Sequence, residues 1–112
     1  MSDSFGGIVL SGGNKILLRK PKNNFDGYSW TFAKTTCNLN EAPEAAAIRA
    51  VKEKTGYEAR ILAKLSGVFK GSTGSTSFYL MDAKHPPSEI NWQTERICWE
   101  TFYLFRVPLY LV

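Results

Sequence analysis

The sequence predicts one α/β or α+β domain, and three observations lead to this class. The 112 residues are enough for one hydrophobic core and too few for two domains. An apolar fraction of 44 %, with 13 % aromatic residues, argues against a disordered chain. One helix is well signalled near the middle, and short apolar or alternating segments lie on both sides of it. Strands around one helix are typical of a sheet that a helix covers.

The expected strands are short segments separated by turn residues. The sequence SGGN at 11–14 predicts a hairpin turn, KGSTGSTS at 70–77 predicts a second turn, and HPPSE at 85–89 breaks the pattern. In chain order the expected extended segments are FGGIVL (5–10), KILLRK (15–20), YSWTF (28–32), EARILAKL (58–65), GVF (67–69), FYLMDA (78–83) and RICWETFYLF (96–105).

The helix is expected to begin at Pro43 and to close at Gly56. Proline suits the first helical position, and Glu44 places a negative charge near the positive end of the helix dipole. A glycine supplies the left-handed conformation that ends many helices. Ala42 stands where a capping side chain is usual, which costs about 1 kcal/mol. The apolar stripe that should face the core consists of Ala47, Ile48 and Val51.

Composition restricts the partners and the compartment. The 14 basic and 10 acidic residues give 14 − 10 = +4. This charge suits an anionic partner such as a phosphate ester, although many soluble domains carry as much, and nothing indicates specific nucleic-acid recognition. Cys37 and Cys98 lie far apart in sequence, which favours reduced thiols and leaves a disulfide as the alternative. With no signal peptide and no membrane span in the sequence, we expect a cytoplasmic protein.

The stretch from Thr35 to Tyr57 resembles the Nudix box of hydrolases that cleave nucleoside diphosphates linked to another group. The box reads Gly, five residues, Glu, seven residues, Arg-Glu, an aliphatic residue, any residue, Glu-Glu, any residue, Gly and an apolar residue. The flanking segments GGIVL, KILLRK, WTFAK and EARI also resemble family strands, so the likeness covers roughly residues 6–100. The residues in register with the box are Glu41, Arg49, Val51, Glu53, Gly56 and Tyr57.

This resemblance implies a fold, a substrate class and a cofactor. The expected fold is a Nudix-type α/β/α sandwich with a mixed β-sheet, formed by residues 1–112 as a single domain. The expected ligand is a nucleotide or nucleoside diphosphate derivative, and the expected cofactor is Mg²⁺ or Mn²⁺. By resemblance, Glu41 pairs with Arg49 and holds the preceding loop to the helix, while Gly56 closes that helix.

The departures from the box fall on its chemistry. The family has three glutamates where this chain has Ala50, Glu53 and Lys54, and a glycine where it has Thr35. Spacings of three and four residues place the three positions on one helical face, where carboxylates can converge on Mg²⁺. A carboxylate about 4 Å from a dication contributes roughly 8 kcal/mol at an effective dielectric of about 20. We therefore expect weak metal binding by Glu53 alone and impaired catalysis.

Two functions remain open for this site. As a hydrolase, the chain would use Glu53 as its catalytic and metal-binding carboxylate together with Glu95 or Glu44. As a binding module, it would hold phosphates without metal through basic side chains, of which the candidates are Lys34, Lys54 and Arg19. The ordinary alternatives are a solvated loop residue for Glu95 and an exposed helix-end lysine for Lys54. A truncated duplicate without a selected function is a third interpretation.

The C-terminal segment 100–112 departs from the family as well. A Nudix domain usually continues into a closing helix, whereas ETFYLFRVPLYLV is aromatic and contains Pro108. We expect the usual C-terminal helix to be lacking. So many large apolar side chains need a surface to cover, either on the same domain or in a homodimer.

Overall fold

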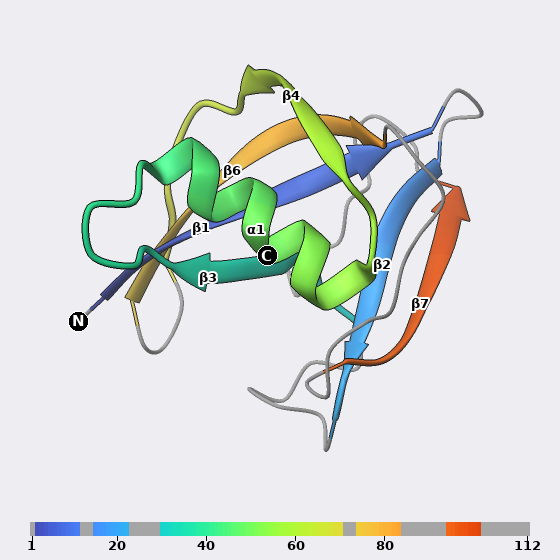
Figure 1. The fold of residues 1–112 in the computed structure, drawn as a ribbon. Coiled ribbons are helices and arrows are strands. Elements are labelled where there is room, and N and C mark those ends of the chain that lie inside the picture. The colour runs from blue at the N-terminus through green and yellow to red at the C-terminus, as the bar shows by residue number, and fades with distance from the viewer. Residues whose placement is uncertain (1, 12–14, 23–29, 71–73, 84–93, 102–112) are drawn as a thin grey trace.

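The computed structural model describes residues 2–11, 15–22, 30–70, 74–83 and 94–101. Within these residues the chain forms a mixed β-sheet and one helix, α1 (Pro43–Thr55) (Figure 1). The predicted class, an α/β fold with a mixed sheet, is confirmed. The strands are β1 (Ser2–Leu10), β2 (Lys15–Pro21), β3 (Ala33–Thr36), β4 (Ala59–Lys64), β5 (Phe69–Lys70), β6 (Gly74–Ala83) and β7 (Thr94–Thr101).

Strand β1 organises the sheet, whose order is β4-β6-β1-β2-β7. Along its whole length β1 runs parallel to β6, and the other pairings are antiparallel. On its other side β1 has two neighbours in turn: residues 4–7 pair with β3, and Leu10 pairs with Ile16 of β2. The short strand β3 therefore has one edge on β1 and pairs with no second strand within the described residues.

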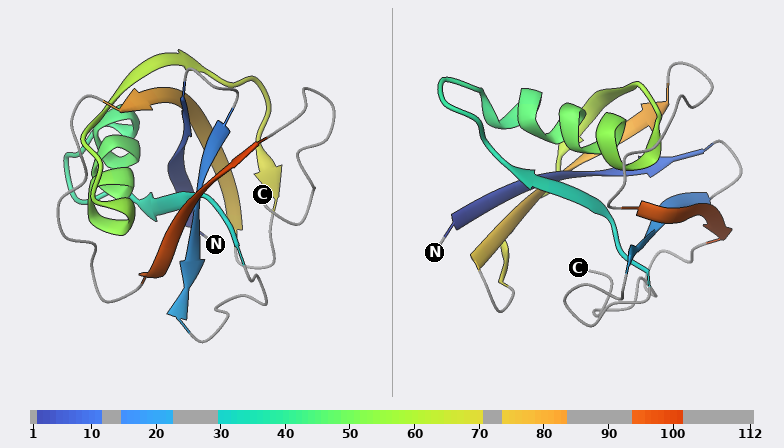
Figure 2. Two further views of the ribbon diagram at one scale, coloured as in Figure 1. Left: turned by 90° about the vertical axis from the view of Figure 1, so that its right-hand side faces the viewer. Right: turned by 60° about the horizontal axis from the view of Figure 1, so that its bottom comes forward.

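Helix α1 packs over β1 and β3 on one face of the sheet (Figure 2). Gly7 permits this close approach, because a Cβ atom there would lie 2.6 Å from Val51 Cγ2 and 2.7 Å from Met81 Sδ. Val51 and Met81 are fully buried, so neither has open space into which to move. The missing side chain at Gly7 thus sets how closely the helix lies on the sheet.

The core lies on both faces of the sheet. On the helix face, Val51 of α1 packs with side chains of β1, β2 and β6, and Trp99 of β7 joins them at the edge. On the opposite face Phe32 meets Phe78 edge to face, with ring centroids 5.6 Å apart. Alternate residues of each strand therefore supply the two sides, as the period of a strand requires.

Both ends of α1 lie where the sequence predicts them. Pro43 occupies the first turn, and Ala42 before it makes no side-chain capping bond. Gly56 follows with φ of 81° and donates its backbone N–H to the Lys52 carbonyl at 3.0 Å. Tyr57 then turns onto Trp99, whose Nε1–H donates to the Tyr57 hydroxyl at 3.2 Å. The register of the helix is therefore fixed at both ends.

Two extended segments differ from the predictions. Residues 28 and 29 of the strand expected at 28–32 lie outside the described residues. Thr31 forms an isolated bridge to Arg19, and the strand β3 lies at Ala33–Thr36. Of the turn expected at 70–77, Lys70 belongs to β5 and residues 74–77 belong to β6, while residues 71–73 lie outside the described residues. In both cases pairing with β1 determines the strand, and the local sequence does not contain that information.

Cys37 and Cys98 are not joined by a disulfide, so that alternative is not realised. Residues 102–112, which form most of the apolar C-terminal segment, lie outside the described residues. The packing of this segment on the domain and the homodimer stay predictions. No helix in the described part of the chain has the length and apolar character needed to cross a membrane.

Candidate functional site

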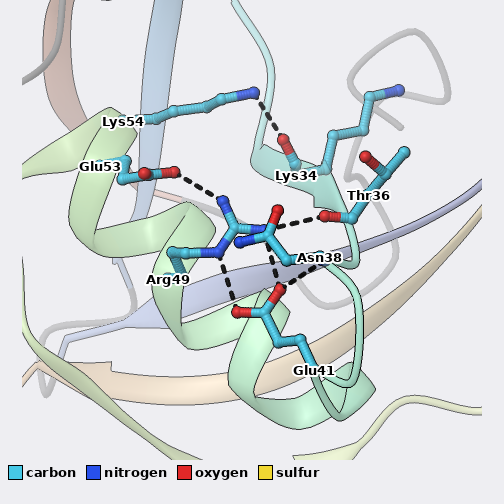
Figure 3. A network of polar contacts seen from close by, with 7 residues as sticks. All are labelled: Lys34, Thr36, Asn38, Glu41, Arg49, Glu53 and Lys54. Atoms are coloured by element: carbon cyan, nitrogen blue, oxygen red, sulfur yellow. Dashed lines mark hydrogen bonds and ion pairs between the residues drawn. The ribbon is translucent and has the colours of Figure 1, made fainter.

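The loop between β3 and α1 is held by Glu41. Its carboxylate accepts the backbone N–H of Asn38 at 2.9 Å and two N–H groups of Arg49, each also at 2.9 Å (Figure 3). The Arg49 hydrogen bond, followed by that from Asn38, lowers the pKa of Glu41 to about 2. The contact expected from the box between Glu41 and Arg49 is present, and it ties the loop to the helix.

Arg49 connects three elements of the site. Besides Glu41, its NH2 donates to the backbone carbonyl of Thr36 in β3 at 2.9 Å. Its NH1 lies 3.0 Å from Oε1 of Glu53, one helical turn further along α1. Glu53 is 45 % exposed, so water screens this ion pair. Of the three positions where the family has metal-binding glutamates, the one that keeps its glutamate therefore faces an arginine.

Lys54 turns toward β3 and not toward a carboxylate. Its ammonium group is part-buried and donates to the backbone carbonyl of Lys34 at 2.6 Å (Figure 3). The pKa of Lys54 is lowered to about 8, chiefly by burial and next by the nearby charge of Arg19, with smaller contributions from Lys34 and Arg49. Glu53 opposes this shift without cancelling it. The charged form of Lys54 is thus held in an unfavourable, positive environment.

Arg49 and Lys54 together satisfy the outer edge of β3. They are five residues apart, about 7.5 Å along the helix axis. The carbonyls that accept from them belong to Thr36 and Lys34, two residues apart and about 6.8 Å along the strand. Because these lengths nearly match, both bonds form while the helix lies alongside the strand. Sequence reasoning missed these acceptors, since a backbone carbonyl exists at every position and leaves no residue signal.

The Lys34 side chain does not join Lys54. A Cβ atom on Gly6 would lie 2.9 Å from Lys34 Cβ and 3.0 Å from Phe78, which belongs to the face away from α1. The amino group of Lys34 accordingly points away from Lys54 in Figure 3. The sequence grouped the two lysines as phosphate ligands, whereas the structure joins them through the Lys34 carbonyl.

Arg19 lies on the helix face beside Lys54, but it is buried. Its side chain is only 7 % exposed, and its Nε donates to the Thr94 hydroxyl of β7 at 2.9 Å. Burial lowers the pKa of Arg19. Arg19 therefore acts on Lys54 through space, and Thr94, 75 residues away, is a partner that the sequence did not signal.

The two proposed replacement carboxylates differ in placement. Glu44 and Glu53 are nine residues apart on α1, which puts them about 13.5 Å apart along the axis and on opposite sides of the helix. They cannot bind one metal ion together. Glu95 follows Thr94 in β7, so its backbone is near Arg19, while its side chain lies outside the described atoms. Its role stays a prediction.

The model of the NUDIX domain matches residues 2–103. The chain belongs to the NUDIX family. No curated protein sequence matches it significantly.

Solved structures support the same NUDIX fold. A UDP-X diphosphatase has a TM-score of 0.74 at 13 % identity, with 89 % of this chain and 50 % of that chain covered. A NUDIX hydrolase from Nitrosomonas europaea has a TM-score of 0.75 at 16 % identity, with 89 % and 57 % covered. A C. elegans Ap4A hydrolase in a binary complex has a TM-score of 0.72 at 19 % identity, with 88 % of this chain and 79 % of that chain covered. The chain thus spans about half of the length of the first two structures.

The divalent metal ion that the NUDIX family implies does not fit the donors described here. Of the three box positions, Ala50 is fully buried in the apolar core, Glu53 faces Arg49, and Lys54 is itself a cation. The described residues hold no group of three or more His, Cys, Asp or Glu side chains that suits a metal. Mg²⁺ and Ca²⁺ sites are built from several oxygen ligands, and a neighbouring ammonium repels the ion.

Proposed function

We propose that this NUDIX protein binds a nucleotide or nucleoside diphosphate derivative without a divalent metal ion, and that it hydrolyses such compounds weakly or not at all. The observation that carries the proposal is Lys54. It replaces a family glutamate, its ammonium is part-buried, and Arg19 stands beside it. A phosphate group is the ligand that such a positive site favours.

The immediate contacts of Lys54 leave donors for an anion. An ammonium group has three N–H donors, and among the described residues the Lys34 carbonyl accepts one of them. Glu53 is the acidic residue whose charge acts on Lys54, and its carboxylate already pairs with Arg49. Each well-placed charge-assisted hydrogen bond is worth about 1.5 to 3 kcal/mol. A few of them give binding in the micromolar to millimolar range.

The same contacts argue against efficient hydrolysis. In the family reaction, divalent cations polarise the phosphoryl oxygen and help to generate the attacking hydroxide. Lys54 can neutralise phosphate charge, but a cation cannot accept a proton from water. Of the three metal-binding positions of the box, Glu53 alone keeps a carboxylate, and Arg49 donates to it. Binding without rapid turnover is therefore the outcome that this arrangement favours.

Binding and turnover can be measured separately on the same protein. ADP-ribose and a nucleoside triphosphate are titrated with EDTA present, and the amide signals of Lys54 and Gly56 are followed by NMR. We expect shifts that weaken with salt and that weaken further in Lys54→Glu without added metal. Absence of any shift at millimolar ligand, with or without Mg²⁺, would contradict the proposal. Lys64→Glu, an equal charge change on exposed β4, is the matched control.

A second candidate function is metal-dependent pyrophosphohydrolysis by Glu53 with Glu95. The observation that favours it is the bond between Arg19 and Thr94, which brings the neighbour of Glu95 to the site. EDTA-sensitive hydrolysis of nucleoside diphosphate-linked compounds, lost in both Glu53→Gln and Glu95→Gln, would support this function. Turnover at background in Mg²⁺ and Mn²⁺ would support binding alone.

A further inference from the structure

The Lys34 carbonyl is the feature of the site that the box pattern does not describe. It lies at the outer edge of β3, and Lys54 donates to it at 2.6 Å. An oxygen atom that accepts a cationic donor at this distance is also a suitable ligand for a hard divalent cation. Glu53 is the residue before Lys54, so its carboxylate comes from the same helical turn. The oxygen donors around position 54 are thus the Lys34 carbonyl, which Lys54 contacts, and the carboxylate of the preceding Glu53, which pairs with Arg49.

We infer that Lys54 is the residue that determines whether this site accepts a divalent cation, and that its ammonium group now takes the cation's place at the Lys34 carbonyl. The substitution Lys54→Glu would give a second carboxylate beside that of Glu53 and would free the Lys34 carbonyl. These are enough oxygen ligands for an ion that keeps several waters. The inference does not depend on nucleotide binding, since it concerns the ligand-free protein.

Other features of α1 support a single decisive position. The helix register is fixed by Pro43 and Gly56, so a substitution at 54 keeps the side chain beside β3. Ala50, the remaining non-carboxylate position, is fully buried among apolar side chains. A carboxylate there is costly until a cation is present. The charge of the residue at position 54 is thus the property that a single substitution can change to alter metal binding.

The test compares thermal unfolding of the wild type, Lys54→Glu and the control Lys64→Glu, each in EDTA and in about 10 mM Mg²⁺ or Mn²⁺. A site with a millimolar Kd then raises the Tm by about 5 °C. We expect this increase in Lys54→Glu but not in the wild type or in Lys64→Glu. The increase should be larger in a triple variant that also carries Thr35→Gly and Ala50→Glu. Equal increments in Lys54→Glu and Lys64→Glu would overturn the inference.

A second measurement covers the case in which Lys54→Glu does not fold. Paramagnetic Mn²⁺ is added to the wild type, and line broadening of the amides from Glu53 to Gly56 is recorded. We expect no more broadening there than at exposed carboxylates elsewhere. Selective broadening of these amides at submillimolar Mn²⁺ would show that Lys54 does not exclude the ion. Nucleotide shifts in EDTA are unaffected by either outcome, so the proposed function is tested independently.

Discussion

Lys54→Met should make the ligand-free protein more stable at neutral pH. The lysine carries its charge among Arg19, Lys34 and Arg49, and only Glu53 acts in the opposite direction. These surroundings lower its pKa from 10.5 to about 8. Charged Lys54 therefore opposes folding, which is common where a side chain is placed for binding.

The size of the effect follows from the pKa and the lost hydrogen bond. A shift from 10.5 to about 8 corresponds to an upper limit of about 3 kcal/mol against the charged form. Solvent screening of a part-buried group reduces this value, and the lost bond to the Lys34 carbonyl removes about 1 kcal/mol more. We expect a net gain of about 1 to 2 kcal/mol, or a Tm higher by about 4 to 8 °C.

The pH dependence identifies the cause. Between pH 8 and 10.5 the unfolded chain binds more protons at Lys54 than the folded chain does, so wild-type stability rises with pH across this window. The penalty is fully present below about pH 8 and is lost above about 10.5. The advantage of Lys54→Met should therefore shrink as the pH increases.

Thermal unfolding at several pH values from 7 to 10.5 measures this difference, with Lys64→Met as the control for loss of an exposed lysine on β4. Addition of pyrophosphate at pH 7 should raise the Tm of the wild type and not that of Lys54→Met. A gap between wild type and variant that does not change with pH would refute the reasoning, because the stability cost would not come from the ammonium charge.

Two further predictions concern the frame of the site. Gly7→Ala should destabilise the protein by about 1 to 3 kcal/mol, because its Cβ would meet Val51 at 2.6 Å, and adding Val51→Ala should recover part of the loss in chemical unfolding. A full additive loss in the double variant would contradict this contact. Glu41→Gln should loosen the loop before α1, because Arg49 and the Asn38 amide lose a charged acceptor; faster hydrogen exchange at Asn38 is the measurement, and unchanged exchange would exclude the role given to Glu41.

The arrangement also explains why Lys54 can have a structural effect and a binding effect together. Its bond to the Lys34 carbonyl satisfies an edge of β3 that no second described strand covers. Its remaining donors and the adjacent Arg19 make the same place attractive to phosphate. Replacing Lys54 by arginine should preserve both effects better than replacing it by methionine, because the charge and the donor are retained.

The sequence by itself determined the features whose signals are local. Pro43 and Gly56 place the ends of α1, because the proline ring fixes φ and the missing Cβ of glycine permits the left-handed conformation. The resemblance to the Nudix box implies that Glu41 pairs with Arg49, and the contact is present at 2.9 Å. Comparison of the sequence with the box also identifies Glu53 as retained and Ala50 and Lys54 as changed. Impaired metal binding is the prediction that follows from these changes.

The tertiary structure decided which atoms Lys54 and Arg19 contact. Strand β3 begins five residues later and ends four residues later than the local pattern predicts, since its pairing with β1 fixes it. That pairing turns the Lys34 side chain to the far face and leaves the Lys34 carbonyl for Lys54. Arg19 is buried against Thr94, which is distant in sequence. Strand pairing and backbone acceptors depend on contacts between remote segments, so residue types alone do not specify them.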